Sequence, residues 1–240
     1  MIILIGTGHV FDLSDALRAR FDEIEPDVIC VELDRQRYLA LLSRKNEPEK
    51  NHKSRDKAPV IYNFLAKFQE SMAKQYGVKA GDEMLTAIRY AQAYNLPVEL
   101  IDLNAREIFT KMLKSMSFTE KFRLLFSGFA GFFVNRGVVE KELEKIEDNF
   151  DIYLNQISKK FPSIKKALID DRNAHMFDRL IKLNEKYERI VACIGDGHVY
   201  GISNLLDSKN VEYKTIRLSE LKQTKVTQSR AGFTVEYEEI

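Results

Sequence analysis

The chain has 240 residues, which corresponds to one large domain or two small ones. Lys and Arg total 37 and Asp and Glu total 36, so the formal net charge is +1. This balance argues against a nucleic-acid protein held by a basic field and against a disordered acidic chain. We expect no membrane span, because no window holds 18 consecutive apolar residues, and no signal peptide, because the amino end lacks a basic start.

Short apolar runs alternate with helical patterns along the chain. The runs predict buried strands at 2–5, 28–31, 98–101, 190–194 and 211–218. Helical patterns are expected at 15–21, 35–42, 60–76 and 80–94, and from the end of the fourth strand to about 206. Strands separated by helices predict an α/β fold with a mainly parallel central sheet and flanking helices, although the strand order is left open.

One stretch interrupts this alternation. Residues 104–188 contain no strand-like run and predict a long helical insertion or cap within a single domain spanning 1–240. The charged segment 43–57 is expected to be a solvated loop, and 233–237 alternates as an edge strand would. Residues 122–134 carry five Phe and are expected to form a core helix, with a dimer contact, an apolar substrate groove or a shallow membrane contact as alternatives.

Ionisable residues follow four of the predicted strands. His9 follows the first strand, Glu32 the second and Asp102 the third, and Asp196 and His198 follow the fourth. The carboxyl ends of parallel strands lie along one edge of a sheet, where open α/β folds bind their ligands. We therefore expect these five side chains to converge.

Two of these positions lie in a repeated motif. Gly6-Thr-Gly-His9 and Gly195-Asp-Gly-His198 share the pattern Gly-x-Gly-His-Val, in which glycines allow close backbone approach and could hold each His stiffly. Two satisfied structural histidines are the alternative. A dinucleotide site is not expected, because the first loop lacks the third glycine of GxGxxG. His52, in the charged segment, is expected to have no role.

The acidic and arginine candidates each have a plainer alternative. Glu32 is a candidate metal ligand or general base, or only a carboxylate stabilised by a helix dipole. Asp102 has the same alternative as a helix cap. Arg35 and Arg106 lie within one turn after a strand end and Arg37 lies further along; Arg suits a substrate carboxylate or an oxyanion, and otherwise forms surface ion pairs.

Two further groups of residues complete the candidates. Arg172, His175 and Met176 are spaced to share a helix face that could close over the crevice. Cys30 and Cys193 lie in apolar runs without a CxxC pattern, and they predict reduced core thiols and fit a reducing cytosol.

The order of these motifs resembles the TraB family (TraB/PrgY, GumN-like and Tiki relatives), which is related to the erythromycin-esterase and ChaN-like proteins. The matching segments are Gly6-Thr-Gly-His-Val10, 26–35, Gly81-Asp-Glu-Met84, 101–106, Asp171-Arg-Asn-Ala-His-Met176, and 194–199 with Gly201-Ile202. They cover nearly the whole chain.

The resemblance implies an α/β core with one shared site, and Tiki relatives are described as metal-dependent proteases that prefer ions such as manganese or cobalt. The motif histidines of the family match His9 and His198, and its acidic position matches Glu32. Arg35, Arg106 and Arg172 match recurrent arginines. Asp196 departs from the family, since many members carry a small residue there, and it is expected to bind metal or to cap a helix. The role of TraB in shutting down peptide pheromones does not transfer from fold and site alone.

These observations predict a hydrolase of peptide or amide bonds that uses a divalent ion (Mn, Co, Zn or Fe). The expected metal ligands are His9, His198, Glu32 and Asp196, the other catalytic residues are Arg35, Arg106 and Arg172, and Arg37, Asp102 and His175 contact the substrate. A metal-free esterase using His and Glu as general base is one alternative. A protein that sequesters a peptide or signal without turnover is another. The expected partners are a peptide or small-molecule substrate and a second copy of the chain docked through the helical block. No nucleic-acid partner is expected. The expected location is the cytoplasm, with attachment to a membrane surface as an alternative left open.

Overall fold

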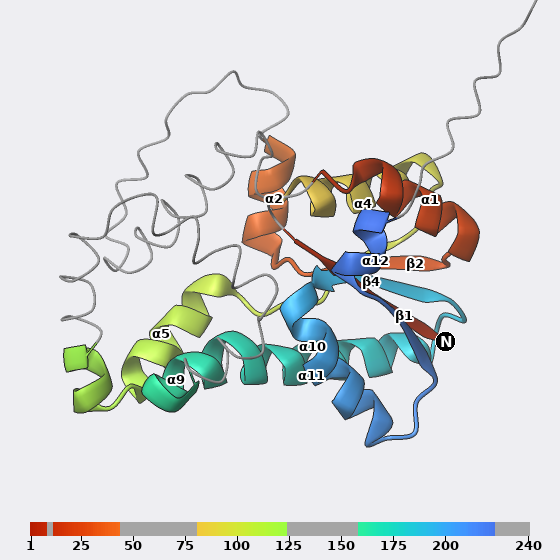
Figure 1. The fold of residues 1–240 in the computed structure, drawn as a ribbon. Helices are drawn as coiled ribbons and strands as arrows, with labels where there is room; N and C mark the ends of the chain where they lie inside the picture. Colours follow the sequence, from red (N-terminus) through yellow and green to blue (C-terminus); the bar gives the residue numbers. More distant parts are fainter. Residues whose placement is uncertain (9–11, 44–80, 124–157, 224–240) are drawn as a thin grey trace, which may run out of the picture.

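A computed structural model gives the fold and describes residues 1–8, 12–43, 81–123 and 158–223. Its centre is a five-stranded sheet in which every pairing is parallel, with the spatial order β3-β2-β4-β1-β5. Figure 1 labels the three central strands, β2, β4 and β1. The strands are β1 (Ile2–Thr7), β2 (Val28–Val31), β3 (Val98–Leu100), β4 (Ile190–Gly195) and β5 (Tyr213–Ile216). The predicted α/β fold with a parallel sheet is confirmed.

The fifth strand is shorter than predicted. It was expected over 211–218, whereas only Tyr213–Ile216 is strand. Leu218 already begins α12 (Leu218–Gln223), and its backbone N–H donates to the Asp196 carboxylate. Val211 and Leu218 are apolar because they pack against the core clusters, although neither residue lies in the strand.

Helices cover both faces of the sheet. One face packs against α1 (Ser14–Ile24), α2 (Arg35–Ser43), α4 (Asp82–Ala93) and α12, and the other against α10 (Asp171–Asn184) and α11 (Asp196–Asp207). Alternate residues of each strand supply the two cores: in β1, Ile3 and Ile5 face the first layer and Ile2 and Leu4 the second. Because both faces are covered, the central strands β1, β2 and β4 are continuous apolar runs, which is why they could be found from sequence.

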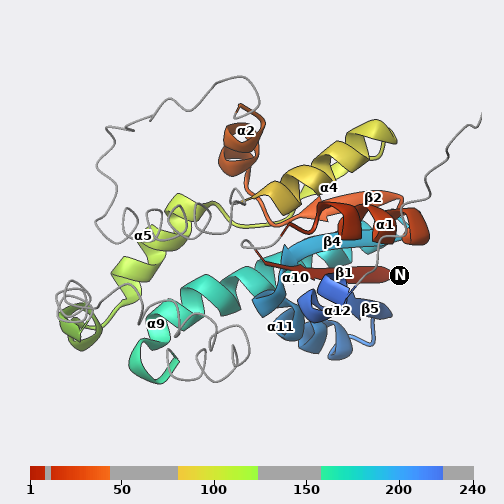
Figure 2. The same cartoon turned by 45° about the horizontal axis from the view of Figure 1, so that its top comes forward.

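The helical block contributes both an arm and part of the core. The helix α5 (Ala105–Ser115), the short α9 (Pro162–Lys165) and the π-helix η2 (Lys166–Asp170) pack around a separate apolar cluster, and Figure 2 shows α5 and α9 to one side of the sheet. In η2 the Asp171 N–H donates to the Lys166 carbonyl, five residues back. The chain then enters α10, whose Met176 and Leu180 are fully buried against the strands.

The predicted core thiols are confirmed. Cys30 and Cys193 are free and buried, one in each core layer, and burial raises the pKa of both thiols well above its ordinary value. The expected loop at 43–57 begins one residue too early, because Ser43 is the last residue of α2. The rest of that loop, the helix at 60–76, the strand at 233–237 and most of the Phe-rich segment 122–134 lie outside the described residues.

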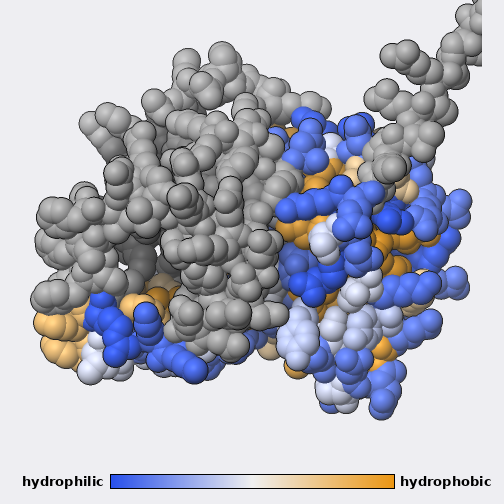
Figure 3. All heavy atoms as spheres, viewed as in Figure 1, coloured by the Kyte–Doolittle hydropathy of each residue, from blue (hydrophilic) through white to orange (hydrophobic). Residues whose placement is uncertain are grey.

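Among the residues that the structure describes, no helix combines the length and apolarity needed to cross a membrane. On the face drawn in Figure 3, hydrophilic side chains predominate and the apolar ones lie in separate patches.

Candidate functional site

The carboxyl ends of the strands meet at one edge of the sheet, as parallel pairing requires. Thr7 at the end of β1 pairs with Gly195 at the end of β4, and Val31 at the end of β2 pairs with both Cys193 and Leu100. The two Gly-x-Gly-His segments therefore leave neighbouring strands. His9 itself lies outside the described residues.

Glu32 and His198 face each other at this edge. Glu32 Oε1 lies 3.5 Å from His198 Nε2, and Glu32 Oε2 accepts a hydrogen bond of 2.5 Å from the Gly195 N–H. Glu32 is 9% exposed and His198 is 5% exposed. A Cβ on residue 195 would meet Glu32 Oε2 at 3.3 Å, so glycine there leaves the carboxylate room to reach the backbone.

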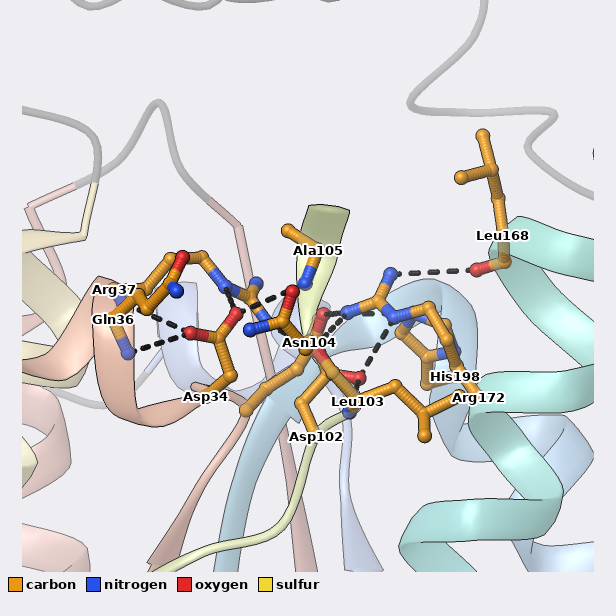
Figure 4. A network of polar contacts seen from close by, with 12 residues as sticks. Asp34, Gln36, Arg37, Asp102, Leu103, Asn104, Ala105, Leu168, Arg172 and His198 are labelled. Atoms are coloured by element: carbon orange, nitrogen blue, oxygen red, sulfur yellow. Dashed lines mark hydrogen bonds and ion pairs between the residues drawn. The ribbon is translucent and has the colours of Figure 1, made fainter. Parts of the chain in front are cut away.

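Arg172 joins this pair to Asp102 (Figure 4). Its Nη2 donates to both Glu32 Oε1 and Asp102 Oδ2, the latter at 2.6 Å, while Nε donates to Asp102 Oδ1 at 2.9 Å. Its Nη1 donates to the carbonyl of Leu168 in η2 at 3.3 Å. A single guanidinium thus binds two carboxylates from two different strand ends, in the fork geometry that Arg offers and Lys does not.

The same contacts extend to α2. Arg37 Nη2 donates to Asp102 Oδ2 at 2.5 Å and Arg37 Nε donates to Asp34 Oδ2 at 2.8 Å. Asp34 caps α2 by accepting from the N–H groups of Gln36 and Arg37, and it also accepts from the Ala105 N–H at the start of α5. We call the set Glu32, Asp34, Arg37, Asp102, Arg172 and His198 the edge network.

Electrostatics keeps the acids of the edge network ionised. Burial alone raises the pKa of Glu32, but the charges of Arg172 and His198 and the Gly195 N–H outweigh it, so the pKa lies below its ordinary value. Burial likewise raises the pKa of Asp102, and its hydrogen bonds and ion pairs with Arg172 and Arg37 more than reverse this. Three carboxylates then face two guanidinium groups, which leaves one negative charge when His198 is neutral.

Asp196 lies outside the edge network. Its two oxygens accept from Arg217 Nε and Nη2 at 2.9 and 2.7 Å, and Oδ1 also accepts from the Leu218 N–H at 2.9 Å. The helix that it caps is therefore α12. Gly6 makes room for it, because a Cβ there would stand 2.1 Å from Asp196 Oδ1.

The other predicted residues are distributed around the edge network. Arg35 and Arg106 are exposed in the first turns of α2 and α5, and the guanidinium groups within the edge network come from Arg37 and Arg172. His175 is half-buried and lines a hollow of about 320 Å³ between α5, η2 and α10, where burial lowers the pKa of its imidazole. Of the three residues expected to share a face over the crevice, Arg172 reaches the edge network, whereas Met176 packs into the sheet core.

Sequence reasoning missed two residues that support His198. Asn173 Oδ1 lies 2.7 Å from His198 Nδ1, and Gly201 provides the space for that amide. Both residues stand inside the motifs that carried the family resemblance, so the motifs marked them without indicating what they do. Neither apolar periodicity nor strand-end position could single them out.

Within the described ranges, no group of three or more His, Cys, Asp or Glu side chains is placed to hold a metal ion. Glu32 and His198 form a pair of suitable donors, and the residue expected beside them, His9, is not among the described residues.

Comparisons with known proteins agree with the order of these motifs. The family model described as the TraB/PrgY/gumN family matches residues 1–214. An uncharacterized protein of Methanocaldococcus jannaschii is 30% identical over 218 residues, which cover 85% of this chain and 53% of that protein. The chain therefore spans about half the length of this relative. The match over 1–214 places the strand-end carboxylates and both Gly-x-Gly-His segments within the family region, and the chain belongs to the TraB/PrgY/gumN family.

Proposed function

We propose that the protein is a metal-dependent hydrolase of peptide or amide bonds whose reaction takes place at the edge network. The observation that carries the proposal is the pair formed by His198 Nε2 and Glu32 Oε1, two metal-donor atoms 3.5 Å apart and shielded from solvent. Membership of the TraB/PrgY/gumN family supports the placement, because the pair joins the second Gly-x-Gly-His motif to the strand-end Glu.

The donor pair fits a divalent ion. Ligand nitrogen and oxygen atoms lie about 2.0–2.2 Å from a tetrahedral Zn²⁺, so two of them stand about 3.4 Å apart. The separation of 3.5 Å matches that value and is too long for a strong hydrogen bond between the two side chains. His198 and Glu32 would hold the ion together with His9. Such an ion, when bound, lowers the pKa of a water ligand to about 7 and so supplies hydroxide near neutral pH.

The remaining residues of the edge network orient these donors. Arg172 and Asp102 fix the Glu32 carboxylate, and Arg37 closes the arrangement from α2. We assign stabilisation of a substrate carboxylate or oxyanion to Arg35 and Arg106, which are exposed in the first turns of α2 and α5. His175, in the neighbouring hollow, contacts the substrate chain.

Asp196 has no place in this assignment. Its two oxygens accept from Arg217 and from the Leu218 N–H, which belong to the side of β5 and α12 and not to the edge network. We therefore assign Asp196 to holding α12 against the second motif.

Metal uptake tests the proposal directly. The protein is purified without chelator, and its metal content is measured beside His9→Ala, His198→Ala and the control His52→Ala. We expect close to one Mn, Co, Zn or Fe per chain in the wild type and in His52→Ala, and loss of the metal in the two motif variants. Absence of metal from the wild type, with no uptake on titration, contradicts the proposal.

One observation favours a metal-free route as the second candidate. Both oxygens of Glu32 are already bonded, to Arg172 and to the Gly195 N–H, so this carboxylate is held where it can stabilise the imidazolium formed when His198 acts as general base without an ion. Hydrolysis that survives exhaustive chelation and is lost in Glu32→Gln would select this route.

A further inference from the structure

Each ring nitrogen of His198 has a neighbouring side-chain oxygen: Glu32 Oε1 lies near Nε2 and Asn173 Oδ1 lies near Nδ1. Nδ1 lies 2.7 Å from Asn173 Oδ1, and both residues are 5% exposed. An amide oxygen only accepts, so this contact requires the proton on Nδ1. In the neutral imidazole, Nε2 then carries a lone pair, and that lone pair faces Glu32 Oε1.

Gly201 makes this contact possible. It lies one turn after His198 on α11, and a Cβ at this position would stand 2.1 Å from Asn173 Nδ2 and 3.1 Å from Cγ. Glycine inside a helix is destabilising relative to alanine. At position 201 this cost is offset by the close approach of the Asn173 amide from α10.

The neutral amide also suits the charge of the site. The edge network already carries one excess negative charge when His198 is neutral, and a carboxylate at position 173 would add a second in a buried place. An amide sets the tautomer of the ring without that addition.

Consecutive residues of α10 therefore hold the two donors. Arg172 binds Glu32, and Asn173 binds His198. Both follow directly after the π-helix η2, a kind of turn that is frequent at functional sites. The beginning of α10 thus sets the separation and orientation of the two donor atoms.

We propose that Asn173 is the positioning residue of His198, with Gly201 giving it room, and that together they fix the Nδ1–H tautomer so that the lone pair of Nε2 is available to a divalent ion. The metal part of this inference rests on the proposed function, whereas the tautomer does not. Hydrogen-bond partners of ligating histidines contribute about 10–100-fold to metal affinity.

Two measurements on the full chain test the inference. Nitrogen-15 NMR of the imidazoles, with His198 assigned by its absence in His198→Gln, reports which ring nitrogen is protonated. Titration with Mn²⁺, Co²⁺ or Zn²⁺ alone gives the binding constant. The variants are Asn173→Ala, Gly201→Ala and Asn173→Asp, and Asn184→Ala at the exposed end of the same helix is the matched control.

We expect the Nδ1–H tautomer in the wild type and in Asn184→Ala, with equal metal affinity. Asn173→Ala removes the acceptor and Gly201→Ala displaces it; both should lose the fixed tautomer and bind metal about 10–100-fold more weakly. Asn173→Asp keeps an oxygen in place and should restore the tautomer and most of the affinity. Circular dichroism identifies any variant that fails to fold.

The outcomes separate this inference from the proposed function. A wild type with Nδ1–H that takes up no metal would refute the metal site and leave the positioning role standing. A wild-type His198 protonated on Nε2 would overturn the inference even if every variant at position 173 fails to fold. So would metal affinity and tautomer in Asn173→Ala and Gly201→Ala equal to those of the wild type.

Discussion

Arg172→Met is the most informative single change for stability, because one guanidinium separates two buried carboxylates. The substitution keeps an apolar stem but deletes three hydrogen bonds to Glu32 and Asp102 and one to the Leu168 carbonyl. Arg172 is 14% exposed and the Asp102 side chain 0%, so water cannot replace the lost contacts. Removing one member of a buried ion pair costs about 3–5 kcal/mol.

That loss is a large fraction of the stability of a domain, which is about 5–15 kcal/mol. For a chain of this size, each kcal/mol lowers Tm by about 2–4 °C, so we expect a drop of about 6–20 °C. Urea unfolding followed by circular dichroism at pH 7 measures the free energy. Arg35→Met, an exposed arginine at the start of α2, is the matched control and should change it by less than about 0.5 kcal/mol.

The pH dependence distinguishes a lost ion pair from lost packing. In the wild type Arg172 holds the pKa values of Glu32 and Asp102 below their ordinary values, so their stabilising effect is complete above about pH 5 and is lost only on stronger acidification. In Arg172→Met the effect of burial, which raises the pKa values of Glu32 and Asp102, is no longer offset by the charge of Arg172, so both pKa values rise. The variant therefore regains stability as pH falls through these raised pKa values. The gap between the two proteins should narrow from pH 7 to pH 5. A loss under 1 kcal/mol at pH 7, or a gap that does not change with pH, would refute the reasoning.

Three further predictions follow from contacts of the same edge and of the core. Asp102→Asn should lower the free energy of unfolding at pH 7, and the difference from wild type should shrink as pH falls below about 4. The reason is that the pKa of Asp102 is lower in the folded than in the unfolded chain, so the stabilisation by its carboxylate is present above the unfolded pKa and is lost on acidification. Urea unfolding at several pH values measures this difference. Asp196→Asn should cost about 1 kcal/mol through its half-exposed pair with Arg217 and leave metal affinity unchanged, so that weaker metal binding would identify Asp196 as a ligand after all. Cys30 and Cys193 should resist a thiol reagent in the native protein and react together on unfolding, since both are fully buried with raised pKa values; fast labelling of either would contradict its placement.

The sequence was sufficient to predict where the strands are and which edge carries the polar residues. Buried parallel strands are short apolar runs, and the residue after each run is placed by the end of its strand. Glu32, Asp102 and His198 were found in this way, and the structure brings them together with Arg172. The strand order could not be found, because each central strand has the same apolar character whatever its neighbours are.

The choice among arginines also exceeded what sequence could show. Arg35 and Arg37 are two residues apart on α2, so they point to nearly opposite sides of the helix. Which one faces the sheet edge depends on where the helix starts, and that is set by Asp34 accepting from the N–H groups of residues 36 and 37. The cap turns Arg37 toward Asp102 and leaves Arg35 exposed. Sequence distance from the strand end does not predict how α2 is rotated about its axis, so it could not decide between Arg35 and Arg37.

The charge of the edge network connects the two functional proposals. Three carboxylates against two guanidinium groups leave one negative charge at a shielded site. A cation that binds between His198 Nε2 and Glu32 Oε1, which are 3.5 Å apart, would neutralise that charge. A proton on Nε2 supplies one positive charge and a divalent ion supplies two. Because Asn173 already holds the proton of Nδ1, either occupant must enter at Nε2, so proton and metal compete for the same atom. The beginning of α10 therefore decides, through Arg172 and Asn173, how strongly this edge attracts a cation and where the cation binds.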